Sequence, residues 1–136
     1  MDAAVVTVGD ELLAGDTENT NATWLARELT RRGVSVRRVV VVPDEVEAIA
    51  ETVREYSGAY DAVVVTGGLG GTPDDVTMAG VAAAFDRDLE PDPVTRESVE
   101  RSVEWVRENR PDLADFSVDV EAEASIPAGA RPLLNG

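Results

Sequence analysis

Hydrophobic positions along the chain alternate between short apolar runs and longer amphipathic stretches. Three runs rich in alanine and valine, residues 3–8, 34–42 and 62–65, have the length of strands buried in a parallel sheet. An amphipathic stretch follows each run, with apolar residues at helical spacing. This alternation predicts a parallel α/β sheet with helices on both faces.

Capping residues and chain breakers give each expected helix its boundaries. The first begins at Asn19 or Thr20 and ends before Gly33. The second runs from Asp44, paired with Glu47 in a capping-box-like pattern, to Gly58. The third starts with Thr72 as cap and Pro73 in the first turn. The last follows a chain break at residues 91–93 and runs to about Asn109.

The pattern weakens after Pro111. Residues 114–126 fit either a polar helix or a short strand, residues 126–130 fit a turn, and Leu133 with Leu134 resembles the start of a strand. No repeat, low-complexity tract or linker divides the chain. Residues 1–136 are therefore expected to form a single domain.

Residues suited to ligand binding follow all three predicted strands. Asp10 and Glu11 follow the first, Asp44 follows the second, and the sequence TGGLGGTPDDVT, residues 66–77, follows the third. Ligands of open parallel sheets bind beyond the carboxyl ends of the strands. A loop rich in glycine and aspartate is more often only a turn, but three such loops at one sheet edge predict a ligand site.

The glycine-rich loop is suited to holding phosphate. Glycine permits backbone conformations closed to other residues, and its lack of a Cβ lets amide groups approach an anion near the start of a helix. The residues assigned to ligand binding are Asp10 from the first loop and Thr66, Gly67, Gly68, Gly70 and Gly71 from the third.

Asp75 and Asp44 each allow two interpretations. Both are expected in or just before the first turn of a helix, where carboxylates are favoured by capping and by the helix dipole alone. Alternatively, they hold Mg²⁺ against a ligand phosphate, since hard cations prefer oxygen ligands. The spacing alone does not separate the two.

The composition narrows the chemistry. The 136 residues include no cysteine, histidine or lysine, so any metal must sit on oxygen atoms, and phosphate charge must be met by amides, arginine or a cation. The net charge of −15 argues against nucleic acid as a partner. Without a basic N-terminal segment or an apolar run near about 18 residues, the expectation is a cytoplasmic protein with no membrane span.

An acidic chain without lysine predicts adaptation to molar salt, although a GC-rich genome that replaces lysine codons is an alternative. Because 27 acidic residues face only 12 basic ones, repulsion should destabilise the fold below about 0.1 M salt, where the Debye length reaches about 10 Å. We expect the melting temperature to rise steadily with KCl concentration. A melting temperature independent of KCl would contradict the halophilic interpretation.

Several motifs together resemble a known family. VGDELLAG, NTNATWLARELTRRG, VVPDE, TGGLGGTPDDVT and IPAGARPLLNG occur in the order seen in the N-terminal molybdopterin-binding-like domain of CinA-type proteins, which is similar to the MoaB and MogA proteins and to one domain of MoeA. The resemblance covers nearly the whole chain. It implies a three-layer α/β/α sandwich with a mixed, mostly parallel sheet and a pocket for a pterin, such as molybdopterin, or a nucleotide diphosphate.

The resemblance also implies roles for three carboxylates. Asp75 and Asp44 stand at the two aspartate positions linked to chemistry in MogA-like enzymes, and Glu11 stands at the glutamate of the GDEL motif. CinA-like relatives include ADP-ribose pyrophosphatases that depend on divalent metal. The expected site therefore has Asp75, Asp44 and Glu11 as catalytic residues, with Mg²⁺ or another divalent cation on Asp75 and Asp44.

The chain departs from the family pattern near its C-terminal end. Glu121 and Glu123 stand where relatives usually carry basic residues, which favours the alternative of a non-catalytic ligand-binding or oligomerising module. Relatives continue beyond the position of Gly136 with a further glycine-rich loop. From this we expect a domain truncated at its C-terminal end that self-associates as a dimer.

Overall fold

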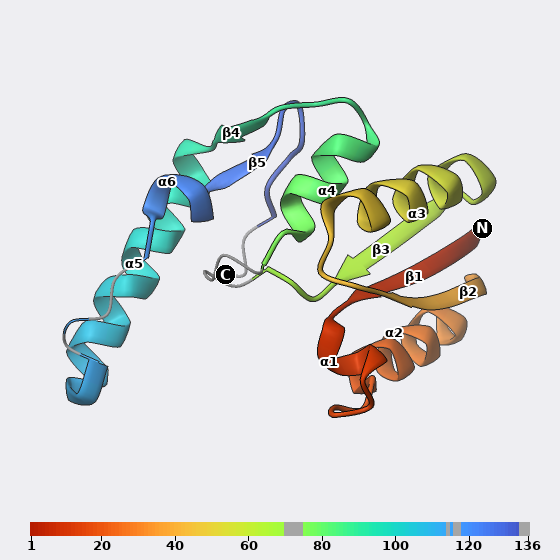
Figure 1. Ribbon diagram of the computed structural model, residues 1–136, viewed down its shortest axis with the longest axis horizontal. Coiled ribbons are helices and arrows are strands. Elements are labelled where there is room, and N and C mark those ends of the chain that lie inside the picture. Colours follow the sequence, from red (N-terminus) through yellow and green to blue (C-terminus); the bar gives the residue numbers. More distant parts are fainter. Residues whose placement is uncertain (70–74, 114, 116–117, 134–136) are drawn as a thin grey trace. The chain divides into compact units, whose positions relative to one another are not determined.

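A computed structural model describes residues 1–69, 75–113, 115 and 118–133 (Figure 1). The chain divides into two compact units, Met1–Asp86 and Arg87–Gly136. The single domain expected over residues 1–136 stays a prediction.

The first unit is built on three parallel strands. β1 (Asp2–Val8) lies between β2 (Ser35–Val42) and β3 (Ala62–Thr66) and pairs with both in parallel. Residues 3–8 of β1 are all buried, as expected for the central strand of a covered sheet. The predicted parallel sheet is confirmed.

Helices cover both faces of this sheet (Figure 1). α2 (Thr20–Arg31) packs on β1 and β2 from one side, and α3 (Val46–Ala59) and α4 (Thr77–Ala84) lie on the other. The short helix α1 (Asp10–Leu13) follows β1 directly. A core of small aliphatic residues joins the sheet to α3 and α4: Val6, Val8, Val42, Ile49, Ala50, Val53 and Ala84. The layered α/β/α arrangement is confirmed.

The start of α2 was predicted correctly, but those of α3 and α4 were not. Asn19 caps α2, since its Oδ1 accepts a hydrogen bond from the N–H of Ala22 at 3.4 Å. α3 begins at Val46, two residues after Asp44, and continues through Gly58 to Ala59. α4 begins only at Thr77, so Asp75 precedes the helix. The predicted cap at residues 72–73 lies outside the described residues.

Gly80 allows α4 to pack closely on α3. A Cβ atom at this position would lie 2.5 Å from Ile49 Cγ2 and 2.6 Å from Ile49 Cβ, and Ile49 is fully buried. We expect Gly80→Ala to lower the free energy of unfolding by about 1–3 kcal/mol, because the two helices must move apart. Urea denaturation measures this change.

Gly58 provides the matched control, because it also lies in a helix but has nothing within 4 Å of its Cβ position. Alanine restricts the unfolded chain, so Gly58→Ala should raise the free energy of unfolding by about 0.5–1 kcal/mol. A gain of similar size at Gly80 would contradict the close packing of α3 and α4.

The second unit contains a small antiparallel sheet and one long helix. β4 (Leu89–Pro91) pairs with β5 (Ser125–Pro127), and between them lie α5 (Pro93–Asn109), the 3₁₀ helix η1 (Pro111–Leu113) and α6 (Val120–Glu123). α5 ends at Asn109 as predicted, but it already includes Pro93, which was expected in the chain break before the helix. Asp92 caps it, since its Oδ2 accepts from the N–H of Thr95 at 2.8 Å. Residues 131–133 have no regular structure, and Leu134, the rest of the predicted strand start, lies outside the described residues.

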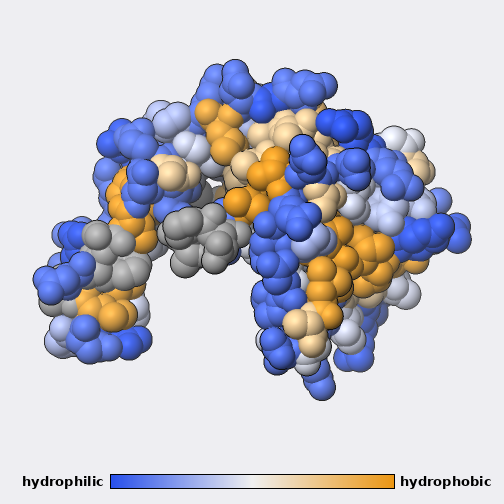
Figure 2. All heavy atoms as spheres, in the orientation of Figure 1, coloured by the Kyte–Doolittle hydropathy of each residue, from blue (hydrophilic) through white to orange (hydrophobic). Residues whose placement is uncertain are grey.

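The surface seen in Figure 2 is mostly hydrophilic, which agrees with the abundance of charged residues. Apolar side chains appear on it in smaller groups. Among the described residues, none of the helices has both the length and the apolar character needed to cross a membrane.

Candidate functional site

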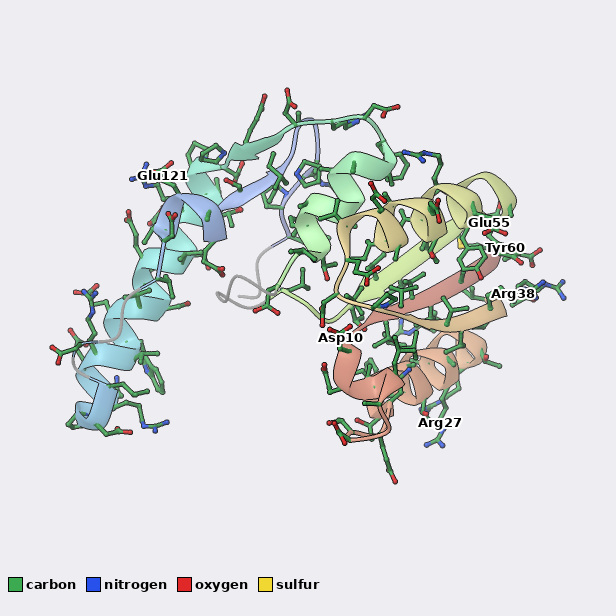
Figure 3. All side chains as sticks on the ribbon, viewed as in Figure 1. Asp10, Arg27, Arg38, Glu55, Tyr60 and Glu121 are labelled. Atoms are coloured by element: carbon green, nitrogen blue, oxygen red, sulfur yellow. The ribbon has the colours of Figure 1, made fainter. Side chains whose placement is uncertain are left out.

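The loops that follow the strands of the first unit converge on one hollow. It has a volume of about 540 Å³, and its lining residues are Asp10, Glu11, Ala14, Asp16, Asp44 and Asp75. All four carboxylates named from the sequence are among them, and Asp16 is an addition. Figure 3 shows Asp10 just after the carboxyl end of β1, where α1 begins.

Two reciprocal hydrogen bonds tie the loop after β1 to the loop after β2. The N–H of Asp10 donates to Asp44 Oδ2 at 3.1 Å, and the N–H of Asp44 donates to Asp10 Oδ1 at 3.0 Å. The N–H of Gly9 donates to the carbonyl oxygen of Val42 at 3.0 Å just beside them. The carboxylate of Asp44 therefore joins two loops, and its interpretation as a helix cap is wrong.

Each of these two aspartates uses one carboxylate oxygen in the reciprocal pair. An ionised carboxylate has two oxygens and about four acceptor positions, so both retain acceptor capacity for a ligand or a cation. Asp44 and Asp75 are half-buried, whereas Asp10, Glu11 and Asp16 are exposed. The hollow thus combines two partly desolvated carboxylates with three that face solvent.

Gly67 and Gly68 let β3 end close against the other two loops. Gly67 has φ of +86°, and a Cβ there would overlap the carbonyl oxygen of Val8. Gly68 has φ of +61°, and its Cβ would overlap Thr77 Oγ1 and lie 3.3 Å from Asp44 Oδ1. Packing therefore requires both glycines, while their binding of phosphate stays a prediction. Gly70 and Gly71 lie outside the described residues.

Two threonines border the glycines. Thr77 is 2% exposed, and its Oγ1 donates to the carbonyl oxygen of Gly67 at 2.7 Å. Sequence reasoning missed this residue, although its place directly after the aspartates in DDVT was a usable signal. The hydroxyl oxygen of Thr66 is buried and has no hydrogen-bond partner within the described part of the chain. Its predicted role in ligand binding stays a prediction.

The carboxylate oxygens that line the hollow are the kind of ligand that a hard divalent cation prefers. All charged groups in its lining are carboxylates, and Mg²⁺ is commonly held by one or two carboxylates together with phosphate and water oxygens. Among the described residues, no group of three or more acidic side chains lies close enough together to hold a metal ion by itself. The assignment of Asp75 and Asp44 as ligands therefore stays a prediction.

The comparisons with known proteins agree with this architecture. A family model for a probable molybdopterin binding domain matches residues 4–114. A protein of Archaeoglobus fulgidus is 51% identical over 135 residues, which cover 99% of this chain and 54% of the relative. The chain spans about half the length of the curated relatives it matches.

Solved structures show the same likeness. The protein CinA of unknown function from Thermoplasma acidophilum aligns with a TM-score of 0.78 and 34% identity over 98% of this chain and 74% of that one. The tungsten cofactor synthesizing protein MoaB from Pyrococcus furiosus aligns with a TM-score of 0.59 and 26% identity over 77% and 66%. The chain belongs to the family of probable molybdopterin binding domains, and its resemblance to CinA-type domains is confirmed.

Proposed function

We propose that the hollow at the strand ends binds the phosphate groups of a pterin or a nucleotide diphosphate through a divalent cation on Asp75 and Asp44. One observation carries this proposal: five carboxylates from the three segments that follow β1, β2 and β3 line one hollow beside a glycine turn. Family membership supports a pterin ligand, and the aligned MoaB protein from Pyrococcus furiosus is a tungsten cofactor synthesizing protein.

The charge of the hollow explains why the cation is needed. Among the described residues, no arginine lines the hollow, and Arg27 and Arg38 project away from the carboxyl ends of the strands (Figure 3). A phosphate oxygen about 4 Å from a carboxylate is repelled by about 4 kcal/mol at an effective dielectric constant of about 20. A divalent cation supplies the opposite charge and lets carboxylate and phosphate oxygens share one centre.

The same arrangement supports hydrolysis of a diphosphate as the reaction. A bound divalent cation would polarise the phosphoryl oxygens. Glu11 borders the hollow from α1, and we assign to it the role of general base, which accepts a proton from the attacking water. The water oxygen bonds to phosphorus as the bridging P–O bond breaks, so ADP-ribose would give AMP and ribose 5-phosphate.

Calorimetric titration with molybdopterin and with ADP-ribose, each with and without Mg²⁺ in molar KCl, tests the binding. The proposal expects one of the two ligands to bind in Mg²⁺ and to be released by a chelator. Binding that is independent of Mg²⁺ would overturn the role of the cation. Release of AMP from ADP-ribose tests the hydrolysis. Binding without AMP release would reject the hydrolysis and support a non-catalytic ligand-binding module.

A further inference from the structure

We infer that Thr77 is a positioning residue, which holds the glycine turn at the end of β3 at a fixed distance from Asp44. The inference rests on the proposed function, because the turn and Asp44 belong to the proposed ligand site. Thr77 lines no part of the hollow and acts through the two glycines.

Thr77 makes two hydrogen bonds to the turn. Its Oγ1 donates to the carbonyl oxygen of Gly67 at 2.7 Å, and its N–H donates to the carbonyl oxygen of Gly68 at 3.3 Å. Thr77 is the first residue of α4, and the first N–H groups of a helix have no partner within the helix. The N-cap residue, Val76, makes no side-chain cap. The helix therefore satisfies its first donor by holding the turn.

Gly68 is the point where three other parts of the chain meet. The position of its missing Cβ overlaps Thr77 Oγ1 and lies 3.3 Å from both Asp44 Oδ1 and Val8 Cγ1. These atoms come from the start of α4, the loop after β2 and the end of β1. A shift of Thr77 would therefore open the space that separates the turn from the Asp44 carboxylate.

The hydroxyl group is the part of Thr77 that performs this role. Thr77 is almost completely buried, so replacing its hydroxyl with a methyl group would leave the Gly67 carbonyl without this donor. The turn is then expected to move away from the new methyl group to find another partner. Serine keeps the donor and should keep the turn in place.

The test compares Thr77→Val and Thr77→Ser with Thr7→Val as the matched control. Thr7 is similarly buried at 4% exposed and lies opposite Thr66 in the sheet, but its Oγ1 accepts from Asn19 Nδ2 at 3.3 Å instead of bonding to the glycine turn. Affinity for ADP-ribose in Mg²⁺ is measured by calorimetry, with molybdopterin as the second probe. Chemical shifts of the Gly67, Gly68 and Asp44 amides are measured by NMR without ligand.

We expect Thr77→Val to weaken binding by about tenfold and to shift these three amides, while Thr77→Ser stays within about threefold of the unsubstituted protein. Thr7→Val should lose stability but not affinity. A Thr77→Val protein with unchanged affinity and unchanged Gly68 and Asp44 amides would overturn the inference. If Thr77→Val does not fold, Thr77→Ala, which adds no methyl group beside the Gly67 carbonyl, is judged by the same outcomes.

Failure of the proposed function would be seen separately. If the unsubstituted protein binds neither ADP-ribose nor molybdopterin, the proposed ligand site is wrong, and the amide shifts alone decide the role of Thr77. Shifts at Gly67, Gly68 and Asp44 in Thr77→Val but not in Thr7→Val would support it. Shifts confined to the sequence neighbours of residue 77 would overturn it.

Discussion

Gly67→Ala is expected to lower the free energy of unfolding by about 3 kcal/mol or more. Two costs combine at this position. The φ of +86° is unfavourable for any residue with a Cβ, and the added methyl group would overlap the carbonyl oxygen of the buried Val8. Relief requires β3 to move away from β1 at its carboxyl end. Denaturation by urea, followed by circular dichroism, measures the loss.

Gly33→Ala separates the two costs. Gly33 has nearly the same φ, +85°, but nothing lies within 4 Å of its Cβ position. Its substitution should cost only the left-handed backbone conformation, about 1–2 kcal/mol. The difference between the two variants then measures the collision with Val8. Equal losses at Gly33 and Gly67 would show that the strand ends are not closely packed.

The strands and several of the helices were predictable because the residues that determine them are local. The apolar run of β1 and the cap at Asn19 each lie within a few residues of the feature they specify. The same holds for α5, where Asp92 and Pro93 stand next to each other at the helix start. Local patterns of this kind need no knowledge of the rest of the fold.

The error at Asp44 has a long-range cause. A capping box is a pattern over four residues, and Asp44 with Glu47 satisfies it. In the folded chain, the Asp44 carboxylate accepts instead from the N–H of Asp10, which is 34 residues away. The competing donor comes from a neighbouring strand end, and helix-start patterns contain no information about it.

The location of the candidate site could be predicted from the sequence, but the contacts within it only in part. The rule that ligands bind at the carboxyl ends of parallel strands brought Asp10, Glu11, Asp44 and Asp75 to one hollow. The reason for glycine at 67 and 68 was less visible, because the crowding by Val8 and Thr77 arises only when the ends of β1 and β3 and the start of α4 come together. The order of strands and loops in the sequence predicted which residues line the hollow. The contacts between these residues depend on how the loops pack in the folded chain.

Asp75→Asn is expected to weaken Mg²⁺-dependent binding of ADP-ribose or molybdopterin by more than about tenfold, which corresponds to about 1.4 kcal/mol. The reason is charge: asparagine keeps the shape and one acceptor oxygen but cannot balance a divalent cation. Asp75 lines the hollow and precedes α4, whose first residue is Thr77. Because asparagine has nearly the same shape and keeps one acceptor oxygen, the free energy of unfolding should change by less than about 1 kcal/mol.

Asp61→Asn is the control for the loss of one negative charge. Asp61 directly precedes β3, at the end of the sheet opposite the hollow, and its Oδ2 accepts from the N–H of Asp2 at 2.8 Å. Its substitution should leave Mg²⁺-dependent binding unchanged. The Debye length is about 10 Å at 0.1 M salt and shorter in molar KCl, so salt screens the charge of Asp61 from the hollow at the other end of the sheet. Lost stability with intact binding in Asp75→Asn would assign Asp75 to the fold and remove it from the site.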